Sequence, residues 1–158
     1  MAGKLKARVD HRLIHGQVTA GWLHEWDITR IVIIDTPTSR DAFLREVYMM
    51  AAPPEIEVSV IAPMEAISIL GEREVSTLVL FKDVAHASAA VDEGLDIAEL
   101  QVGCLPARPG SERICGSVFV DDRDKAMLRR LVQRGIKVFF QTLPKDAPIL
   151  FDELWREL

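Results

Sequence analysis

Short apolar runs alternate with amphipathic segments along most of the chain, a pattern typical of strands joined by helices. The clearest strand is Ile31-Val32-Ile33-Ile34, a continuous β-branched run of the kind that is buried on both faces of a parallel sheet. The other strands are predicted from shorter apolar runs or from alternation of apolar and polar residues. The predicted strands are residues 5–9, 30–35, 55–61, 77–81, 97–102, 114–120 and 136–141.

Helices are predicted between these strands from apolar spacing and from residues that commonly begin or end helices. Thr38 or Ser39 is the expected N-cap of the second helix, and Asp83 is the expected N-cap of the fourth. Three glycines are expected to end helices: Gly71, Gly94 and Gly135. The predicted helices are residues 16–26, 39–52, 63–70, 83–93, 122–134 and 149–157.

This alternation predicts an α/β fold of three layers, α/β/α, with a mainly parallel central sheet of about six to seven strands and helices on both faces. The chain has 158 residues, enough for one well-cored domain and too few for two of ordinary size, so residues 1–158 are expected to form a single domain. Residues 103–113 form the longest irregular segment and are expected beside the first loop, at the carboxyl edge of the sheet.

Composition narrows the classes of function. Hydrophobic residues make up 49% and charged residues 27%, the balance of a soluble globular protein. The net charge of −5 gives no global positive field, which excludes nucleic acid or an anionic lipid surface as a partner attracted by overall charge. No apolar run approaches the roughly 20 residues that span a bilayer, and the N-terminus lacks the apolar core of a signal peptide. We therefore expect a cytoplasmic protein with no direct membrane insertion.

The candidate chemistry lies between the first strand and the first helix. His15 precedes Gly16 at the predicted start of that helix, where backbone N–H groups lack intrahelical partners and the helix dipole favours an anion. Arg8 and Arg12 can add charge-assisted hydrogen bonds to a phosphoryl group. Asp10 can accept the proton of one imidazole nitrogen, which leaves the other nitrogen free as a nucleophile.

This combination suits phosphoryl transfer, in which the protein positions the groups and stabilises charge on the transferred phosphoryl. His15 is the candidate acceptor, and its phosphorylated form could be held by Arg12 and by the backbone amides of Gly16 and Gln17. The chemistry requires no metal and no cofactor on the protein side, and we expect neither.

The residues alone leave three alternatives open. His15 can be a core histidine beside two solvated arginines. The loop can belong to a non-catalytic α/β module that binds a small anion or regulates a partner. His11 and His15, four residues apart, can ligate a metal in a hydrolase, although Gly16 places them in a loop and no Cys or Glu cluster completes such a site.

The other notable polar and aromatic residues are expected to have structural roles and no part in the chemistry. We expect His24 and His86 at the surface, Trp22 and Trp26 as core anchors, and Cys104 and Cys115 as free, buried thiols. Arg108 and Arg113 are expected to solvate the irregular segment of residues 103–113.

The segment Arg8-Val9-Asp10-His11-Arg12-Leu13-Ile14-His15-Gly16-Gln17-Val18, followed by Trp22, resembles the signature of IIB components of the bacterial sugar phosphotransferase system, in the mannose/fructose/sorbose family. The resemblance covers nearly the whole chain. Further matching segments are Ala51-Ala52-Pro53-Pro54, Ala66-Ile67, Val102-Gly103, Gly135-Ile136-Lys137-Val138 and Leu143-Pro144.

The resemblance implies a cytoplasmic phosphocarrier of the protein-N-phosphohistidine–sugar phosphotransferase type, with a mainly parallel α/β fold. A phosphorylated IIA protein would pass its phosphoryl group to His15. From there it would go to a sugar bound by the membrane components IIC and IID, which would hold the chain peripherally at the inner face of the membrane. Two departures stand out: His11 replaces a commonly acidic residue, and residues 101–104 differ from the more usual Asn and paired Gly.

Overall fold

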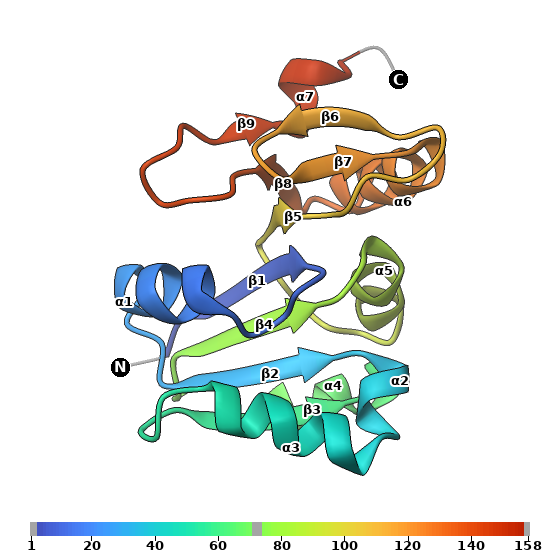
Figure 1. Ribbon diagram of the computed structural model, residues 1–158. Helices are drawn as coiled ribbons and strands as arrows, with labels where there is room; N and C mark the ends of the chain where they lie inside the picture. The colour runs from blue at the N-terminus through green and yellow to red at the C-terminus, as the bar shows by residue number, and fades with distance from the viewer. Residues whose placement is uncertain (1–2, 71–73, 157–158) are drawn as a thin grey trace.

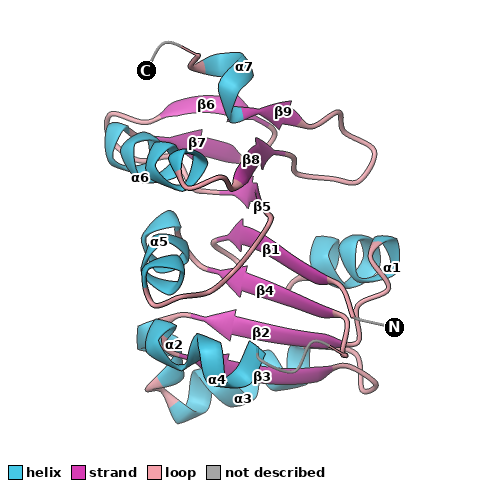
Figure 2. Ribbon diagram, turned by 180° about the vertical axis from the view of Figure 1, so that it is seen from behind, coloured by secondary structure: helices cyan, strands magenta, loops and turns pink. Residues whose placement is uncertain are grey.

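The computed structural model describes residues 3–70 and 74–156. Within these residues, seven strands form one sheet in the order β3-β2-β4-β1-β5-β8-β9. Every neighbouring pair is parallel except β8 and β9, and helices cover both faces of the sheet (Figures 1 and 2). The three-layer, mainly parallel fold predicted from the sequence is confirmed.

The strands of this sheet are β1 (Leu5–Asp10), β2 (Arg30–Ile34), β3 (Glu57–Ile61), β4 (Thr77–Phe81), β5 (Glu99–Cys104), β8 (Lys137–Phe140) and β9 (Ile149–Leu150). A separate antiparallel pair consists of β6 (Glu112–Cys115) and β7 (Val118–Val120). The helices are η1 (Val18–Trp22), α1 (Leu23–Glu25), α2 (Thr36–Ser39), α3 (Ala42–Ala51), η2 (Pro63–Glu65), α4 (Ala66–Leu70), α5 (Val84–Asp92), α6 (Asp122–Gln133) and α7 (Phe151–Leu154).

Two apolar cores lie on opposite faces of the sheet, because successive side chains of a strand point to opposite sides. In β2, Val32 and Ile34 belong to the core under α4, α5 and α6, whereas Ile31 and Ile33 belong to the core under η1 and α1. All five residues of β2 are buried, as its β-branched run predicts.

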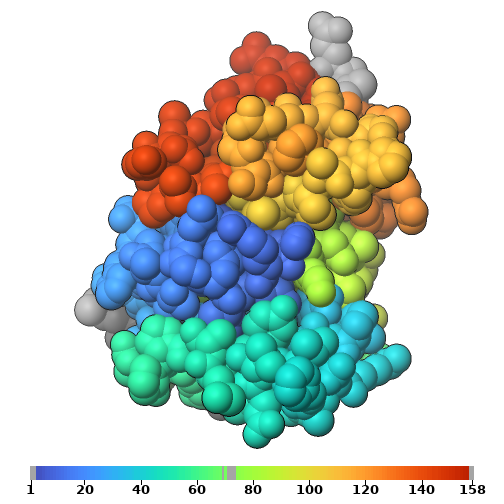
Figure 3. Space-filling model, viewed as in Figure 1, coloured from blue at the N-terminus to red at the C-terminus, as the bar shows by residue number. Residues whose placement is uncertain are grey.

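The first predicted helix is present but contains an unexpected turn. Residues 16–25 are helical, and their central part, η1, is a π-helix. Its neighbour in space is the loop after β8: the Nε1–H of Trp22 donates to the carbonyl of Thr142 at 3.1 Å. In the space-filling view, the blue segment and the orange-red segment lie side by side (Figure 3).

Three predicted elements are wrong in detail. The second helix is capped neither by Thr38 nor by Ser39: Asp35 caps the short α2, and α3 then starts at a new N-cap, Asp41. Residues 114–120 are not one strand of the sheet, because the chain turns back at Gly116, whose φ is +42°. The range predicted as the last helix begins with the short strand β9, and of its described residues only Phe151–Leu154 are helical.

Other predicted boundaries are confirmed. Gly94 and Gly135 follow α5 and α6 with φ of +106° and +90°, the left-handed conformation that ends many helices. Asp83 is the N-cap of α5. Gly71 lies outside the described residues. No helix in the described part of the chain is long and apolar enough to cross a membrane.

The carboxyl end of β1 is where the connections of the sheet diverge. The chain leaves β1 toward η1 and α1 on one face, whereas the chains that leave β4 and β5 lead to α5 and α6 on the other face. A crevice forms where neighbouring connections take opposite faces, and ligands of α/β proteins bind there. The first loop therefore begins at the position in the sheet where a site is expected.

Candidate functional site

The loop after β1 is held in a tight turn. The N–H of Leu13 donates to the carbonyl of Asp10 at 2.9 Å, and the N–H of His11 donates to the carbonyl of Cys104, at the end of β5, at 3.1 Å. Leu13 has a φ of +58°, a conformation that is strained for a branched side chain, and that side chain is fully buried. The buried side chain and the two backbone hydrogen bonds fix the path of the chain toward His15.

His15 and Asp10 form a directly hydrogen-bonded pair. His15 Nε2 lies 2.7 Å from Asp10 Oδ2, and the Asp10 side chain has no exposed surface. Burial opposes ionisation of Asp10, but the hydrogen bond from His15 and the charge of Arg8 outweigh it, so the pKa of Asp10 lies below its ordinary value. A carboxylate only accepts hydrogen bonds, so Nε2 carries the imidazole proton. Nδ1 of His15 is then the nitrogen with a free lone pair.

Arg8 lies beneath this pair and is completely buried. A guanidinium has five N–H donors, and all five are used: two contact Asp10 Oδ2, one contacts Gln101 Oε1, and the others contact the carbonyls of Gln141 and Thr142. Arg8 therefore has no N–H left for a bound anion, and the sequence-based expectation that it contacts a phosphoryl group directly does not fit this geometry. Arg8 instead places a fixed positive charge beside the carboxylate of Asp10.

The space for Arg8 depends on a glycine in the neighbouring strand. A Cβ atom at Gly103, in β5, would lie 2.0 Å from Arg8 Cζ. On another side, the Trp22 ring centroid lies 5.4 Å from Arg8 Cζ, and the Trp22 and Trp26 ring centroids are 4.4 Å apart. Trp22 is buried and Trp26 packs partly buried against the core, so both are the core anchors expected from the sequence.

Arg12 is the more accessible arginine of the loop, with 36% of its side chain exposed. Its backbone N–H donates to Asp10 Oδ1 at 3.0 Å, and its Nη2 donates to Gln17 Oε1 at 2.8 Å. The first helical hydrogen bond runs from Thr19 N–H to His15 C=O, at 3.0 Å. Gly16 and Gln17 therefore lie in the first turn, where backbone N–H groups have no partner within the helix. The guanidinium of Arg12 and the backbone amides of Gly16 and Gln17 therefore come from one short segment, with Arg12 before His15 and the amides after it.

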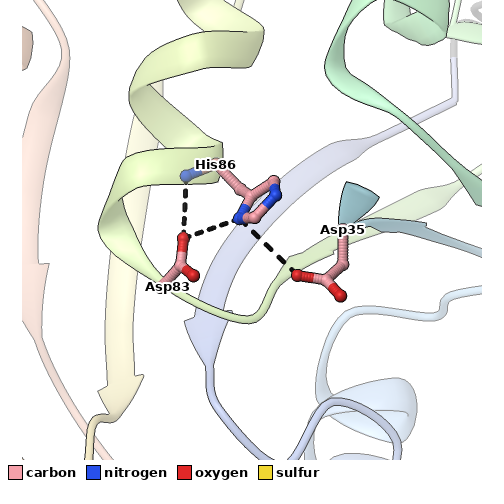
Figure 4. Close-up of side chains that lie close together, drawn as sticks. All are labelled: Asp35, Asp83 and His86. Carbon is pink, nitrogen blue, oxygen red and sulfur yellow. Dashed lines mark hydrogen bonds and ion pairs between the residues drawn. The ribbon is translucent and has the colours of Figure 1, made fainter. Parts of the chain in front are cut away.

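The residues that sequence reasoning missed form a second polar cluster, made by Asp35, Asp83 and His86 (Figure 4). In the described part of the chain, these side chains are the group whose ligand atoms lie close enough together to hold a metal ion. His86 Nδ1 lies 2.8 Å from Asp83 Oδ1 and 3.5 Å from Asp35 Oδ1. His86 was expected at the surface, but its side chain is only 19% exposed.

The hydrogen bonds of His86 do not suit a metal ligand. Its Nε2 accepts the backbone N–H of Thr36 at 3.1 Å, so in the neutral ring the proton is on Nδ1, the atom that faces the two carboxylates. A metal-bound histidine instead donates its second N–H to an acceptor. The role of the cluster is therefore structural: its hydrogen bonds and ion pairs connect the start of α5 to the turn between β2 and α2.

Arg108 also differs from its expected role as a solvated loop residue. It donates to Asp124, a nearly buried carboxylate in the first turn of α6, and lies 3.6 Å from Asp121 Oδ2. Arg108 thus connects the segment of residues 103–113 to α6. The two cysteines are free thiols, as expected; Cys104 is also buried as expected, whereas Cys115 is only partly buried. Burial raises the pKa of Cys104.

Comparisons with known proteins add to this geometry. The model of a family described as PTS system sorbose subfamily IIB component matches residues 5–157. A sorbose-specific EIIB component of Klebsiella pneumoniae is 30% identical over 146 residues, which cover 90% of this chain and 89% of that protein. The mannose-specific EIIAB component of Escherichia coli K12 is 27% identical over 94% of this chain, which spans 47% of that longer protein. The crystal structure of the IIBSor domain of the Klebsiella pneumoniae sorbose permease superposes with a TM-score of 0.87 at 28% identity, covering 98% of each chain.

Proposed function

The chain belongs to the sorbose subfamily of IIB components of the phosphotransferase system, and we propose that His15 is the residue through which it carries the phosphoryl group. Members of this family are phosphocarriers in sugar uptake, and the chain is a sugar phosphotransferase of this kind. The observation that carries the assignment to His15 is its hydrogen bond to Asp10, which leaves Nδ1 as the nucleophilic nitrogen.

In the proposed loading step, Nδ1 of His15 attacks the phosphorus of a phosphohistidine on the donor. The new N–P bond forms as the donor's N–P bond breaks, and the donor histidine leaves as a neutral imidazole. The His15 ring gains positive charge, which Asp10 stabilises through the Nε2–H. Arg12 and the amides of Gly16 and Gln17 are proposed to hold the phosphoryl oxygens.

Discharge reverses these changes. A sugar hydroxyl oxygen attacks the phosphorus, the N–P bond to His15 breaks, and the hydroxyl proton passes to solvent. His15 returns to the neutral tautomer that Asp10 fixes. Arg8 is proposed to act indirectly in both steps, because its buried guanidinium keeps Asp10 ionised and in place.

The family implies a IIA donor and IIC and IID membrane components as partners in the system. We propose that a phosphorylated IIA protein loads His15, and that the sugar is presented by IIC and IID at the cytoplasmic face of the membrane. The E. coli relative is named as an EIIAB component, which joins the donor and carrier names in one protein. Sorbose and mannose both occur among the names of relatives at similar identity, so we assign the choice of sugar to the membrane components. The single central sheet supports treating residues 1–158 as one IIB domain.

Transfer of a radioactive phosphoryl group from a phosphorylated IIA protein tests this proposal. The label should appear on His15 of the wild type, attached to Nδ1, and should be lost in His15→Ala. His24→Ala is the matched control, because His24 is exposed on α1 and should leave labelling unchanged. Label on another residue, or on Nε2 of His15, would contradict the mechanism. Phosphate binding that survives His15→Ala without covalent label would favour the non-catalytic anion-binding alternative.

A further inference from the structure

His11 is a titratable residue of the loop that the proposed transfer does not use. It lies in the turn between Asp10 and Leu13, and its backbone N–H is fixed to the carbonyl of Cys104. Its side chain is half-buried. Among the described residues, its Nδ1 is a buried ring nitrogen with no hydrogen-bond partner. A buried nitrogen without a partner is less costly as a bare lone pair than as an N–H, so the free protein favours the unprotonated Nδ1.

The charges around His11 also disfavour a proton while His15 is unmodified. Burial is the largest effect and lowers the pKa of His11. Asp10, on β1, opposes this change, whereas Lys82 after β4 and Arg12 and His15 on the loop add to it. At neutral pH the ring of His11 is therefore predominantly neutral, because the Asp10 carboxylate is already paired and the two cations, Arg12 and Lys82, repel an additional positive charge.

We propose that His11 takes up a proton from solvent when His15 becomes phosphorylated, and that the resulting imidazolium stabilises the phosphoryl group together with Arg12. The inference rests on the proposed function of His15. His11 would then be a positioning residue for the carried phosphoryl group, whose charge follows the loading state of the carrier.

The chemistry of loading supplies the reason for this uptake. The transferred PO3 unit brings one net negative charge and three acceptor oxygens into a loop whose free charges are mainly positive. A nearby anion raises the pKa of an imidazole, and an acceptor gives a new N–H its missing partner. No bond of the transfer itself changes: one proton moves from water to His11 as the N–P bond to His15 forms.

A thermodynamic linkage follows. If the pKa of His11 is higher in the phosphorylated protein than in the free protein, the phosphorylated protein binds more protons between the two pKa values. The equilibrium constant for loading His15 should therefore rise as pH falls through that interval. A pKa difference of about one unit would change this constant about tenfold across the interval.

The experiment combines nuclear magnetic resonance and transfer equilibria on the full chain. The pKa of the His11 ring is measured by pH titration before and after labelling of His15 by a phosphorylated IIA protein, and it should rise by about one unit. The loading equilibrium is then measured over an assay range of about pH 5.5 to 8 in the wild type, His11→Asn and His24→Asn. His11→Asn should remove the contribution of one proton from the pH dependence, and His24→Asn should not.

The outcomes separate the two proposals. If His15 accepts the label but the pKa of His11 does not change, or if His11→Asn leaves the pH dependence of loading intact, the inference about His11 is overturned and the phosphocarrier assignment stands. If no label reaches His15, both are overturned. A loss of folding in His11→Asn would not affect the ring titration, which is carried out on the wild type.

Discussion

The fit between Gly103 and Arg8 gives a quantitative prediction. In Gly103→Ala, the new Cβ would lie 2.0 Å from Arg8 Cζ and 2.2 Å from both Nη atoms. Carbon atoms in contact are normally about 3.5 Å apart or more, so the guanidinium must move by about 1.5 Å. The end of an arginine side chain usually moves easily, but this one is fully buried and makes five hydrogen bonds.

Such a movement would stretch most of these contacts beyond hydrogen-bond distance and weaken the ion pair with Asp10. Overpacking together with a disrupted buried ion pair is expected to cost about 3 kcal/mol of the free energy of unfolding. Urea unfolding followed by tryptophan fluorescence measures this loss, and radiolabel transfer measures the accompanying decrease in the loading of His15. The matched control is Gly21→Ala, whose Cβ would meet Pro144 at an ordinary 3.6 Å.

A double-mutant cycle attributes the loss to the guanidinium. In an Arg8→Met background, Gly103→Ala should cost at least about 1 kcal/mol less than in the wild type, because the group that collides with the new Cβ is gone. A Gly103→Ala protein with the stability and labelling of the wild type would refute the argument. An equal cost in both backgrounds would show that the new methyl group collides with something other than Arg8.

Four further predictions concern the polar contacts of Asp10, His86 and Arg108. Asp10→Asn should lower the rate of His15 labelling by about 100-fold or more, because an amide does not fix the tautomer. The pKa of Asp10 is below its ordinary value, so Asp10 stabilises the fold above about pH 4, and this contribution should be lost as pH falls further; acid unfolding should show a shallower loss in Asp10→Asn. His86→Leu should cost about 1–3 kcal/mol in urea unfolding, because the N–H of Thr36 loses its acceptor, and should leave labelling unchanged. Arg108→Ala should lower the unfolding free energy by a similar amount, about 1–3 kcal/mol, because Asp124 loses its cation; an unchanged urea midpoint would contradict this.

The sheet could be predicted from the sequence because its signals are local. A β-branched run such as 31–34 has few structural solutions other than a buried strand, and an Asp or Gly at a helix end acts within one turn. Residues 114–120 show the limit of such signals. Their apolar composition fits one strand as well as a hairpin. Which of the two forms depends on the left-handed conformation of Gly116 and on the antiparallel pairing of β6 with β7.

The candidate site could be predicted only as a set of residues. The sequence places Arg8 at the end of the first predicted strand and Arg12 on the loop that follows, but it does not distinguish the buried arginine from the accessible one, and both are expected to contact a phosphoryl group. The distinction follows from β1 being a central strand, so that Arg8 and Asp10, two residues apart, point to the same side and must pair. The Asp35, Asp83 and His86 cluster depends on the register of β2 with β4, in which Ile34 pairs with Phe81, and single-chain patterns do not contain that register.

The buried, left-handed Leu13 has a consequence for redesign of this carrier. The buried side chain of Leu13 anchors the loop in the core. The turn closed by Leu13 also fixes the number of residues between Asp10 and His15, the histidine that Asp10 orients. Inserting or deleting one residue there would either expose the anchor or swing His15 away from Asp10, whereas a substitution at an exposed position would do neither. A library built on this loop should therefore keep its length constant and vary the identity of its accessible side chains.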